Sequence, residues 1–366
     1  MRILVAPDKF KGSLDAREVA ENIAIGLRSV QPDAIIDIVP VADGGEGTAD
    51  VIGRALRGVT VRCAAHDALG NEIDAHYIWV ADRATAVMEM SAAAGLWRIA
   101  EAERSLLRAD TFGVGEMIKD ALRCGARTIL IGLGGSATND GGFGMARAFG
   151  FQFFADEREI ESPADLAQLE WIKSPLEQMS VEITAAVDVR NPLLGSRGAA
   201  RIFGPQKGGT PEQLQILERG LKRFADIVAR DLGQDFRDIP GAGAAGGLGF
   251  GLMSFCGAKI RSGFDVVAEF IGLKDAIAKA DLVITGEGRL DEQSLEGKAP
   301  AGVARLAREA GKAVFAIAGF ASDASAVRGL FDKVVVLARP PLTVKQAIAR
   351  APELLRERAG ELARMM

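Results

Sequence analysis

The sequence predicts an α/β fold in two domains, and three observations lead to this prediction. The chain has 366 residues, whereas single hydrophobic cores stop growing near roughly 250–300 residues. Short apolar runs alternate with amphipathic segments near both ends of the chain, as in βα units. From Val59 onward the pattern changes to short or alternating strands. We therefore expect a parallel-sheet domain that is interrupted by an inserted mixed-sheet α/β domain.

The N-terminal segment predicts two βα units. Ile3–Ala6 is a short apolar strand, and Asp15 and Glu18 stand at capping-box spacing before an amphipathic helix, although Ser13 is an alternative cap. A second strand is expected over Ala34–Val39, followed by a helix over residues 49–56.

The last third of the chain returns to this pattern. We expect strands over residues 281–285, 313–318 and 333–337 and helices over 264–280, 300–310 and 343–362. With the first two strands this makes five, the number in a flavodoxin-like variant of the Rossmann-like sheets. The predicted parallel-sheet domain is therefore discontinuous, with residues 1–58 and 262–366 on either side of an insertion over residues 59–261.

The insertion reads as a mixed sheet with covering helices. Strands are expected over residues 59–62, 73–79, 86–90, 128–131 and 181–187, and helices over 112–122 and 211–231. Thr111 is the expected cap of the first of these helices. The run Gly241–Gly249 is expected to be a glycine loop because no strand precedes it.

The stretch Thr128–Met145 carries the clearest functional signal. A buried strand leads directly into a turn in which six glycines expose the backbone, while Ser136, Thr138, Asn139 and Asp140 add polar groups. Such a loop suits an anionic, oxygen-rich ligand, most simply a phosphate.

A dinucleotide site is the alternative for the same stretch. Gly132–Ala137 fits a loose form of the dinucleotide fingerprint, and Asp156 follows near the distance of a ribose-binding acid. This alternative predicts an NAD(P)-dependent oxidoreductase acting on a small hydroxy acid. Against it, Asn139–Gly142 would break the helix that the fingerprint requires.

Charged residues follow several other expected strands. Lys9, Lys11 and Ser13 precede a helix N-terminus, where an anion site and an ordinary capped loop are equally good interpretations. Asp43 and Glu46 in a glycine-rich turn suit either a divalent cation or a plain helix cap.

Composition excludes several classes of protein. A net charge of −5 argues against a nucleic-acid partner, and no apolar run reaches the roughly 18–20 residues that cross a bilayer. Cys63, Cys124 and Cys256 lack paired spacing, which is typical of reduced thiols in a cytoplasmic protein. A Walker-type lysine loop is also absent from the sequence.

Seven glycine-rich or polar blocks follow one another along the chain: Pro7–Ser13, Ala42–Thr48, Gly132–Gly142, Asn191–Gly195, Phe203–Gly208, Gly241–Gly247 and Thr285–Asp291. Together these blocks resemble the glycerate kinase family, the two-domain bacterial type. Lys9 stands where the first block of the family carries a serine, and Arg190 stands where a smaller or acidic residue is usual.

The resemblance implies transfer of the γ-phosphoryl group of ATP to D-glycerate, with Mg²⁺, at the 2-hydroxyl, which gives 2-phosphoglycerate and ADP. Phosphoryl transfer requires charge neutralisation, positioning and a proton acceptor. Asp188 is our candidate base, and Arg289 and Lys298 are candidates for the glycerate carboxylate. We assign the phosphates to Gly134, Gly135, Ser136, Ala137 and Thr138 with Lys9, Lys11, Ser13 or Lys207, and the magnesium ion to Asp43, Glu46, Glu287 or Asp291.

Overall fold

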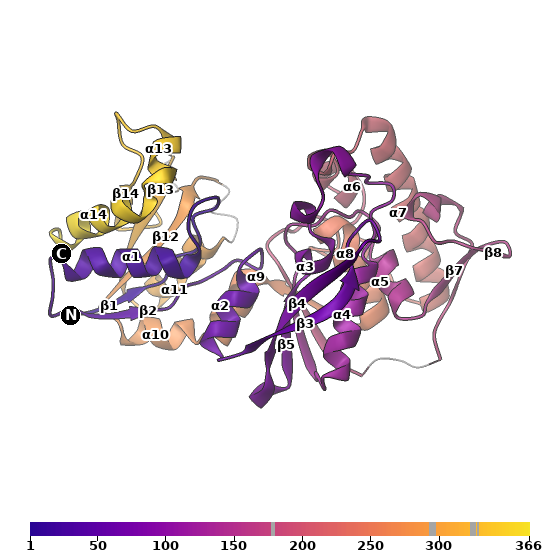
Figure 1. Ribbon diagram of the computed structural model, residues 1–366, viewed down its shortest axis with the longest axis horizontal. Coiled ribbons are helices and arrows are strands. Elements are labelled where there is room, and N and C mark those ends of the chain that lie inside the picture. The colour runs from indigo at the N-terminus through magenta and orange to yellow at the C-terminus, as the bar shows by residue number, and fades with distance from the viewer. Residues whose placement is uncertain (177–179, 293–297, 323–326, 328) are drawn as a thin grey trace. The chain divides into compact units, whose positions relative to one another are not determined.

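The computed structural model describes residues 1–176, 180–292, 298–322, 327 and 329–366. Within these residues the chain forms two compact units (Figure 1). The first unit comprises Met1–Asp43, Asp50–Leu56 and Ser262–Met366, and the second comprises Gly44–Ala49 and Arg57–Arg261. Gly44–Ala49 groups with the second unit because the Glu89 carboxylate accepts hydrogen bonds from its backbone.

The first unit contains a five-stranded parallel sheet. Its strands are β1 (Arg2–Val5), β2 (Ile35–Ile38), β12 (Leu282–Leu290), β13 (Ala313–Ala321) and β14 (Lys333–Val336). They lie in the order β14-β13-β12-β1-β2, and all four pairings are parallel. Counted within this unit, the order is 2-1-3-4-5, which is the flavodoxin-like arrangement and confirms the predicted fold class.

Helices cover both faces of this sheet. Because successive strand residues point to opposite faces, Ile3 and Leu4 enter different cores. The Ile3 side contains α1 (Ala16–Arg28) and α14 (Ala351–Ala363), and the Leu4 side contains α9 (Gly263–Phe270), α10 (Leu273–Lys279) and α11 (Ala299–Glu309). The capping box of Asp15 and Glu18 starts α1 as predicted.

Three predicted elements of the first unit differ in the structure. The helix expected over residues 264–280 breaks between α9 and α10, where Gly272 has a left-handed φ of 66°. The terminal helix divides into α13 (Val344–Ala349) and α14, which has a proline in its first turn. The strand expected to end at Thr285 continues as β12 to Leu290, so Glu287 and Arg289 lie in a strand and not in a loop.

The second unit is built on a mixed sheet, as predicted, but the sheet has six strands, because β11 was not foreseen. Its order is β11-β10-β6-β5-β4-β3, in which β10, β6 and β5 pair in parallel and β5, β4 and β3 pair antiparallel. The strands are β3 (Val59–His66), β4 (Glu72–Val80), β5 (Thr85–Glu89), β6 (Thr128–Gly132), β10 (Glu182–Val187) and β11 (Lys259–Ser262).

Helices surround this sheet, and a cluster of phenylalanines fills part of the core. Phe143 packs on Phe153 with ring centroids 4.8 Å apart, and Phe224 contacts both rings. The helices are α3 (Ser91–Ala94), α4 (Phe112–Arg123), α5 (Phe143–Ala148), α6 (Ala199–Phe203), α7 (Pro211–Leu232) and α8 (Ala244–Cys256). The helix α2 (Thr48–Ala55) starts in this unit, but its residues from Asp50 onward belong to the first unit.

Two features of the second unit differ from the prediction or were not foreseen. The run Gly241–Gly249 is not a free glycine loop, because α8 begins within it at Ala244. A separate antiparallel sheet of three short strands also forms, from β7 (Gln152–Ala155), β8 (Arg158–Glu159) and β9 (Trp171–Lys173).

Among the described residues, no helix is long and apolar enough to span a membrane.

Candidate active site

Three parallel strands of the second unit end at one edge of its sheet. In the register of this sheet, Glu89 at the end of β5 pairs with Gly132 at the end of β6. Asp188, which is exposed, follows directly after β10, the other parallel neighbour of β6. Ligands of parallel sheets bind outside the carboxyl ends of the strands, so this edge is the candidate site of the unit.

The glycine loop, residues 133–142, joins β6 to α5 and is open in its middle. The N–H groups of Leu133 and Ala137 donate to backbone carbonyls at 3.2 and 2.9 Å. Between them, the N–H groups of residues 134–136 have no acceptor among the described residues. Gly135 is exposed and left-handed, with a φ of 71°. Consecutive unpaired N–H groups of this kind attract an anion.

A buried lysine lies beneath the glycine loop. The Lys207 Nζ atom donates to the Ser136 Oγ atom at 2.7 Å and to the Thr138 carbonyl oxygen at 2.6 Å. Only 3% of the Lys207 surface is exposed, and burial lowers its pKa to about 7 although the Asp140 charge acts to raise it. In this structure Lys207 therefore contacts the second half of the proposed phosphate segment, Gly134–Thr138, from inside the protein.

The far end of the loop is anchored by Asp140. Its carboxylate accepts hydrogen bonds from the backbone of Gly142 and Gly144 and from both the N–H and the hydroxyl of Thr111. Thr111 is the N-cap residue of α4, as predicted, but its hydroxyl makes no capping hydrogen bond and donates to Asp140 instead. Asp110 accepts from the Phe112 N–H group at the start of that helix.

The start of α8 closes the loop from another side. Ala245, Gly246 and Gly247 adopt left-handed backbone angles, and the Gly246 carbonyl accepts from the Gly141 N–H group at 3.0 Å. A side chain at Gly246 would meet the Thr138 carbonyl oxygen at 2.0 Å, so only glycine fits. The close contact of α8 with the loop fixes its second half.

Asn139 lies in this loop and was not predicted as a separate site residue. It is 1% exposed, yet neither polar atom of its side-chain amide has a hydrogen-bond partner among the described residues. The sequence signal was its place between Thr138 and Asp140 in the glycine-rich turn.

The turn that carries Glu46 lies against the glycine loop. The Glu89 carboxylate accepts from the N–H groups of Gly47 and Ala49 at 2.8 and 3.1 Å. A side chain at Gly134 would meet the Gly45 Cα atom at 2.8 Å, so these two backbones are in direct contact. Glu46 is exposed and belongs to the second unit, whereas its predicted partner Asp43 belongs to the first.

In the first unit, the strand order reverses between β1 and β12, and Asp8 lies at this point. The Asp8 N–H group donates to the Gly286 carbonyl oxygen at 2.8 Å. The Asp8 carboxyl group is buried, and its pKa is raised well above the usual range by that burial and by the charges of Asp43 and Glu287. The sequence places Asp8 in a loop after the first strand, but we did not predict it as a site residue. The rule that ligands bind where the strand order reverses could have indicated it.

The other predicted residues of the first unit differ in their exposure and in their contacts. Lys11 is exposed, and the Ser13 hydroxyl donates to the Ile348 carbonyl oxygen at 3.2 Å. Arg289 is paired with Asp291 at 3.1 Å and lies over the Phe320 ring. Lys9, Asp43, Glu287 and Lys298 are partly or fully buried in the same unit, and Lys298 is the residue before α11.

The predicted magnesium ligands do not form an all-protein metal cage. Within the part of the chain that the structure describes, no three or more His, Cys, Asp or Glu side chains gather in a way that could hold a metal ion. This does not conflict with a magnesium nucleotide, because Mg²⁺ is usually held by one or two carboxylates together with substrate phosphates and water.

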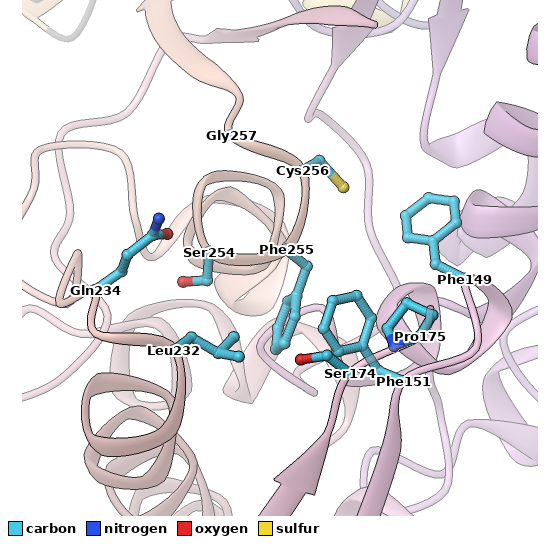
Figure 2. Close-up of a pocket in the computed structure, with 10 residues that line it drawn as sticks. All are labelled: Phe149, Phe151, Ser174, Pro175, Leu232, Gln234, Ser254, Phe255, Cys256 and Gly257. Carbon is cyan, nitrogen blue, oxygen red and sulfur yellow. The ribbon is translucent and has the colours of Figure 1, made fainter. Parts of the chain in front are cut away.

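A cavity of about 350 Å³ lies elsewhere in the second unit, near the C-terminal end of α8 (Figure 2). Figure 2 shows phenylalanine rings on one side and Ser254 with Gln234 on the other. The Ser254 hydroxyl is buried without a partner among the described residues. None of the sequence-predicted site residues lines this cavity.

Comparisons with known proteins agree with this geometry. The family model described as the glycerate kinase family matches residues 3–366. A glycerate 2-kinase of Escherichia coli strain K12 is 43% identical, with 88% of this chain and 86% of the relative covered. A glycerate kinase of Bacillus subtilis strain 168 is 40% identical, with 99% of this chain and 97% of the relative covered.

A solved structure matches the whole fold. The crystal structure of a candidate glycerate kinase 2 from Salmonella typhimurium LT2 has a TM-score of 0.88 and 41% identity, and covers 100% of this chain and 98% of the other. The fold is thus that of an enzyme, a kinase of the α/β class. The chain belongs to the glycerate kinase family.

These findings do not support the dinucleotide alternative. A dinucleotide fingerprint needs a helix that begins in the glycine turn, whereas α5 begins only at Phe143. The left-handed Gly141 and Gly142 precede it, with φ of 69° and 82°. The relatives compared here give no support to an oxidoreductase.

Proposed function

We propose that this chain transfers the γ-phosphoryl group of ATP to the 2-hydroxyl of D-glycerate, giving 2-phosphoglycerate and ADP. The observation that carries the proposal is the glycine loop, whose N–H groups at residues 134–136 are unpaired among the described residues, in a member of this kinase family. The relative from Escherichia coli, a glycerate 2-kinase, supports the choice of hydroxyl.

The phosphates of ATP are assigned to the glycine loop. Three open N–H groups at residues 134–136 provide donors, and the Ser136 hydroxyl is held in place by Lys207. Preorganised donors of this kind stabilise charge on a transferred phosphoryl group without reorganisation during the reaction. Lys9, Lys11 and Ser13 are proposed as further polar contacts to the phosphates from the first unit.

Asp188 is proposed to accept the proton of the attacking hydroxyl. It is an exposed carboxylate at the carboxyl end of β10, beside the strand that carries the glycine loop. A positioned base contributes to phosphoryl transfer by orienting the hydroxyl and accepting its proton. The buried Asp8, whose raised pKa suits an acid–base role, is the second candidate.

Arg289 and Lys298 are proposed to bind the glycerate carboxylate. Arg289 is 71% exposed at its side chain although it pairs with Asp291, so its guanidinium is accessible to a ligand. Its planar fork matches a carboxylate with two parallel hydrogen bonds.

Magnesium is proposed to be held by one or two of Asp43, Glu46, Glu287 and Asp291. When bound with ATP, the ion supplies neutralisation of phosphate charge. The charges of Asp43 and Glu287 raise the pKa of Asp8, and this grouping of carboxylates at one strand edge supports the proposal of a cation there. We also propose that the protein is cytoplasmic, because the cysteines of this chain lack the paired spacing of a disulfide framework.

A coupled assay for ADP with purified full-length protein tests the proposal. ADP release is expected only when ATP, Mg²⁺ and D-glycerate are all present, and chelation of Mg²⁺ should abolish it. Phosphorus NMR of the product is expected to show 2-phosphoglycerate. A 3-phosphoglycerate signal would overturn the regiochemistry alone, and the absence of glycerate-dependent ADP release would overturn the proposed reaction.

A further inference from the structure

Lys207 has no open path to act as a phosphate ligand in this structure. It emerges from a tight turn over Pro205–Lys207, with Gly208 left-handed at a φ of 89° immediately after it. The side chain is buried and donates two hydrogen bonds to the glycine loop, to the Ser136 hydroxyl and to the Thr138 carbonyl oxygen. A long cationic side chain is therefore committed to the underside of the loop.

These contacts lie on either side of Ala137, whose N–H group is already paired with the Ala94 carbonyl. By binding the residues before and after this fixed point, the ammonium group defines the turn of the backbone there. The N–H groups at residues 134–136, which are unpaired among the described residues, lie directly before and at the first of these contacts in the chain.

We propose that Lys207 is a positioning residue for nucleotide binding, which acts through Ser136 by holding the glycine loop in its anion-accepting shape. The inference rests on the proposed function, because it assigns the ATP phosphates to that loop. It goes further in giving Lys207 an indirect role, where the sequence alone suggested a direct phosphate contact.

The protonation of Lys207 provides an independent signature of this role. Burial brings the pKa of Lys207 to about 7, and Asp140 is the charged group that acts on it among the described residues. A phosphate above the loop would favour the charged ammonium. ATP binding should therefore weaken as the pH rises through 7 and Lys207 loses its proton.

A double-mutant cycle on the full-length protein tests the proposal. Dissociation constants for ATP are measured by calorimetry for wild type, Lys207→Met, Ser136→Ala and the double variant. We expect Lys207→Met to weaken binding on the order of ten- to a hundredfold and Ser136→Ala by about three- to tenfold. Because both substitutions remove the same contact, the ATP dissociation constant of the double variant should equal that of Lys207→Met within about twofold.

The exposed Lys222 on α7 provides the matched control. Lys222→Met removes the same charge from the surface and should bind ATP as wild type does, with the same dependence on pH. Lys207→Met should lose the pH dependence that wild type shows between pH 6 and 9. Asp110, whose pKa is also about 7, is present in both proteins, so their difference isolates Lys207.

The possible results separate three situations. Additive effects of the two substitutions, or an unchanged ATP affinity in Lys207→Met, would overturn the positioning role. If Lys207→Met does not fold, Lys207→Gln, which keeps an amide donor, replaces it in the same cycle. Wild-type protein that binds ATP but releases no ADP with D-glycerate would refute the proposed function while leaving this cycle measurable.

Discussion

The Asp140 carboxylate accepts hydrogen bonds from both the backbone N–H and the side-chain hydroxyl of Thr111, at 2.9 and 2.7 Å. The same hydroxyl accepts from the Met145 N–H group at 3.0 Å. Thr111 thereby joins the start of α4 to the start of α5 across the end of the glycine loop. Burial raises the pKa of Asp140, and these donors oppose that rise.

Replacing Thr111 with valine should destabilise the protein by about 3 kcal/mol, because a buried charge loses a donor and the Met145 N–H group loses its acceptor. Thr85→Val is the control, since that buried hydroxyl donates only to the nearby Arg83 carbonyl, and about 1 kcal/mol is expected. Chemical denaturation of the full chain measures both. Equal shifts in the two variants would contradict the bridging role of Thr111.

Gly246→Ala should disrupt the glycine loop as well as stability. Both Gly246 and Gly233 are left-handed, but a side chain at Gly233 meets nothing within 4 Å. Gly233→Ala is expected to cost about 1–2 kcal/mol from backbone strain alone. Gly246→Ala should cost more and also weaken ATP binding, because its methyl group would press on Thr138. Similar unfolding midpoints and ATP affinities for both variants would show that this contact is not essential.

The half-buried Asp110 predicts a specific dependence of stability on pH. Burial is the main cause that raises its pKa to about 7, and the charge of Asp140 adds to it. Because the folded pKa exceeds the unfolded value of about 3.9, stability from this group is complete at low pH and is lost as the pH rises toward 7.

Asp110→Asn should therefore raise the thermal midpoint relative to wild type more at pH 8 than at pH 5, by about 2–4 °C or more. The amide oxygen can still accept from the Phe112 N–H group. Asp82→Asn on the exposed surface should show no such trend. A constant difference at both pH values would rule out the titration of Asp110 as its cause.

Asp188→Asn should lower kcat by about 10²–10⁴-fold while the KM values for ATP and D-glycerate stay within a few-fold. The substitution keeps the shape of the side chain and removes the proton acceptor. Steady-state kinetics of Asp188→Asn and Asp8→Asn, compared side by side, decide between the two carboxylates. A large loss in Asp8→Asn with near-normal turnover in Asp188→Asn would transfer the role of base to Asp8.

The fold class could be predicted because it depends on periodicity. Apolar strands and amphipathic helices at both ends of the chain indicated a discontinuous five-stranded sheet, and the structure forms it. The length of β12 could not be predicted, because Gly286 and Gly288 look like turn residues. In the structure, a side chain at Gly286 would meet the Ile317 carbonyl oxygen at 2.1 Å, so this glycine serves close strand packing.

The site was predictable only in part, because some of its contacts join residues that are far apart in the sequence. The glycine loop is continuous in sequence and could be recognised from its composition. The contact of Lys207 with Ser136 joins residues 71 positions apart, and the burial that lowers the pKa of Lys207 arises only from tertiary packing. We did not predict the helix α8, because its start is rich in glycine. In the structure, three left-handed residues interrupt its first turn.

The position of β1 between β2 and β12 also has a consequence for biosynthesis. Ile3 pairs with Ile36 on one side and with Leu282 on the other. During translation, the ribosome completes all of the second unit before it synthesises β12, the second partner of β1. Nascent chains should thus carry an unfinished N-terminal sheet, a natural client for chaperones, until the last third has emerged.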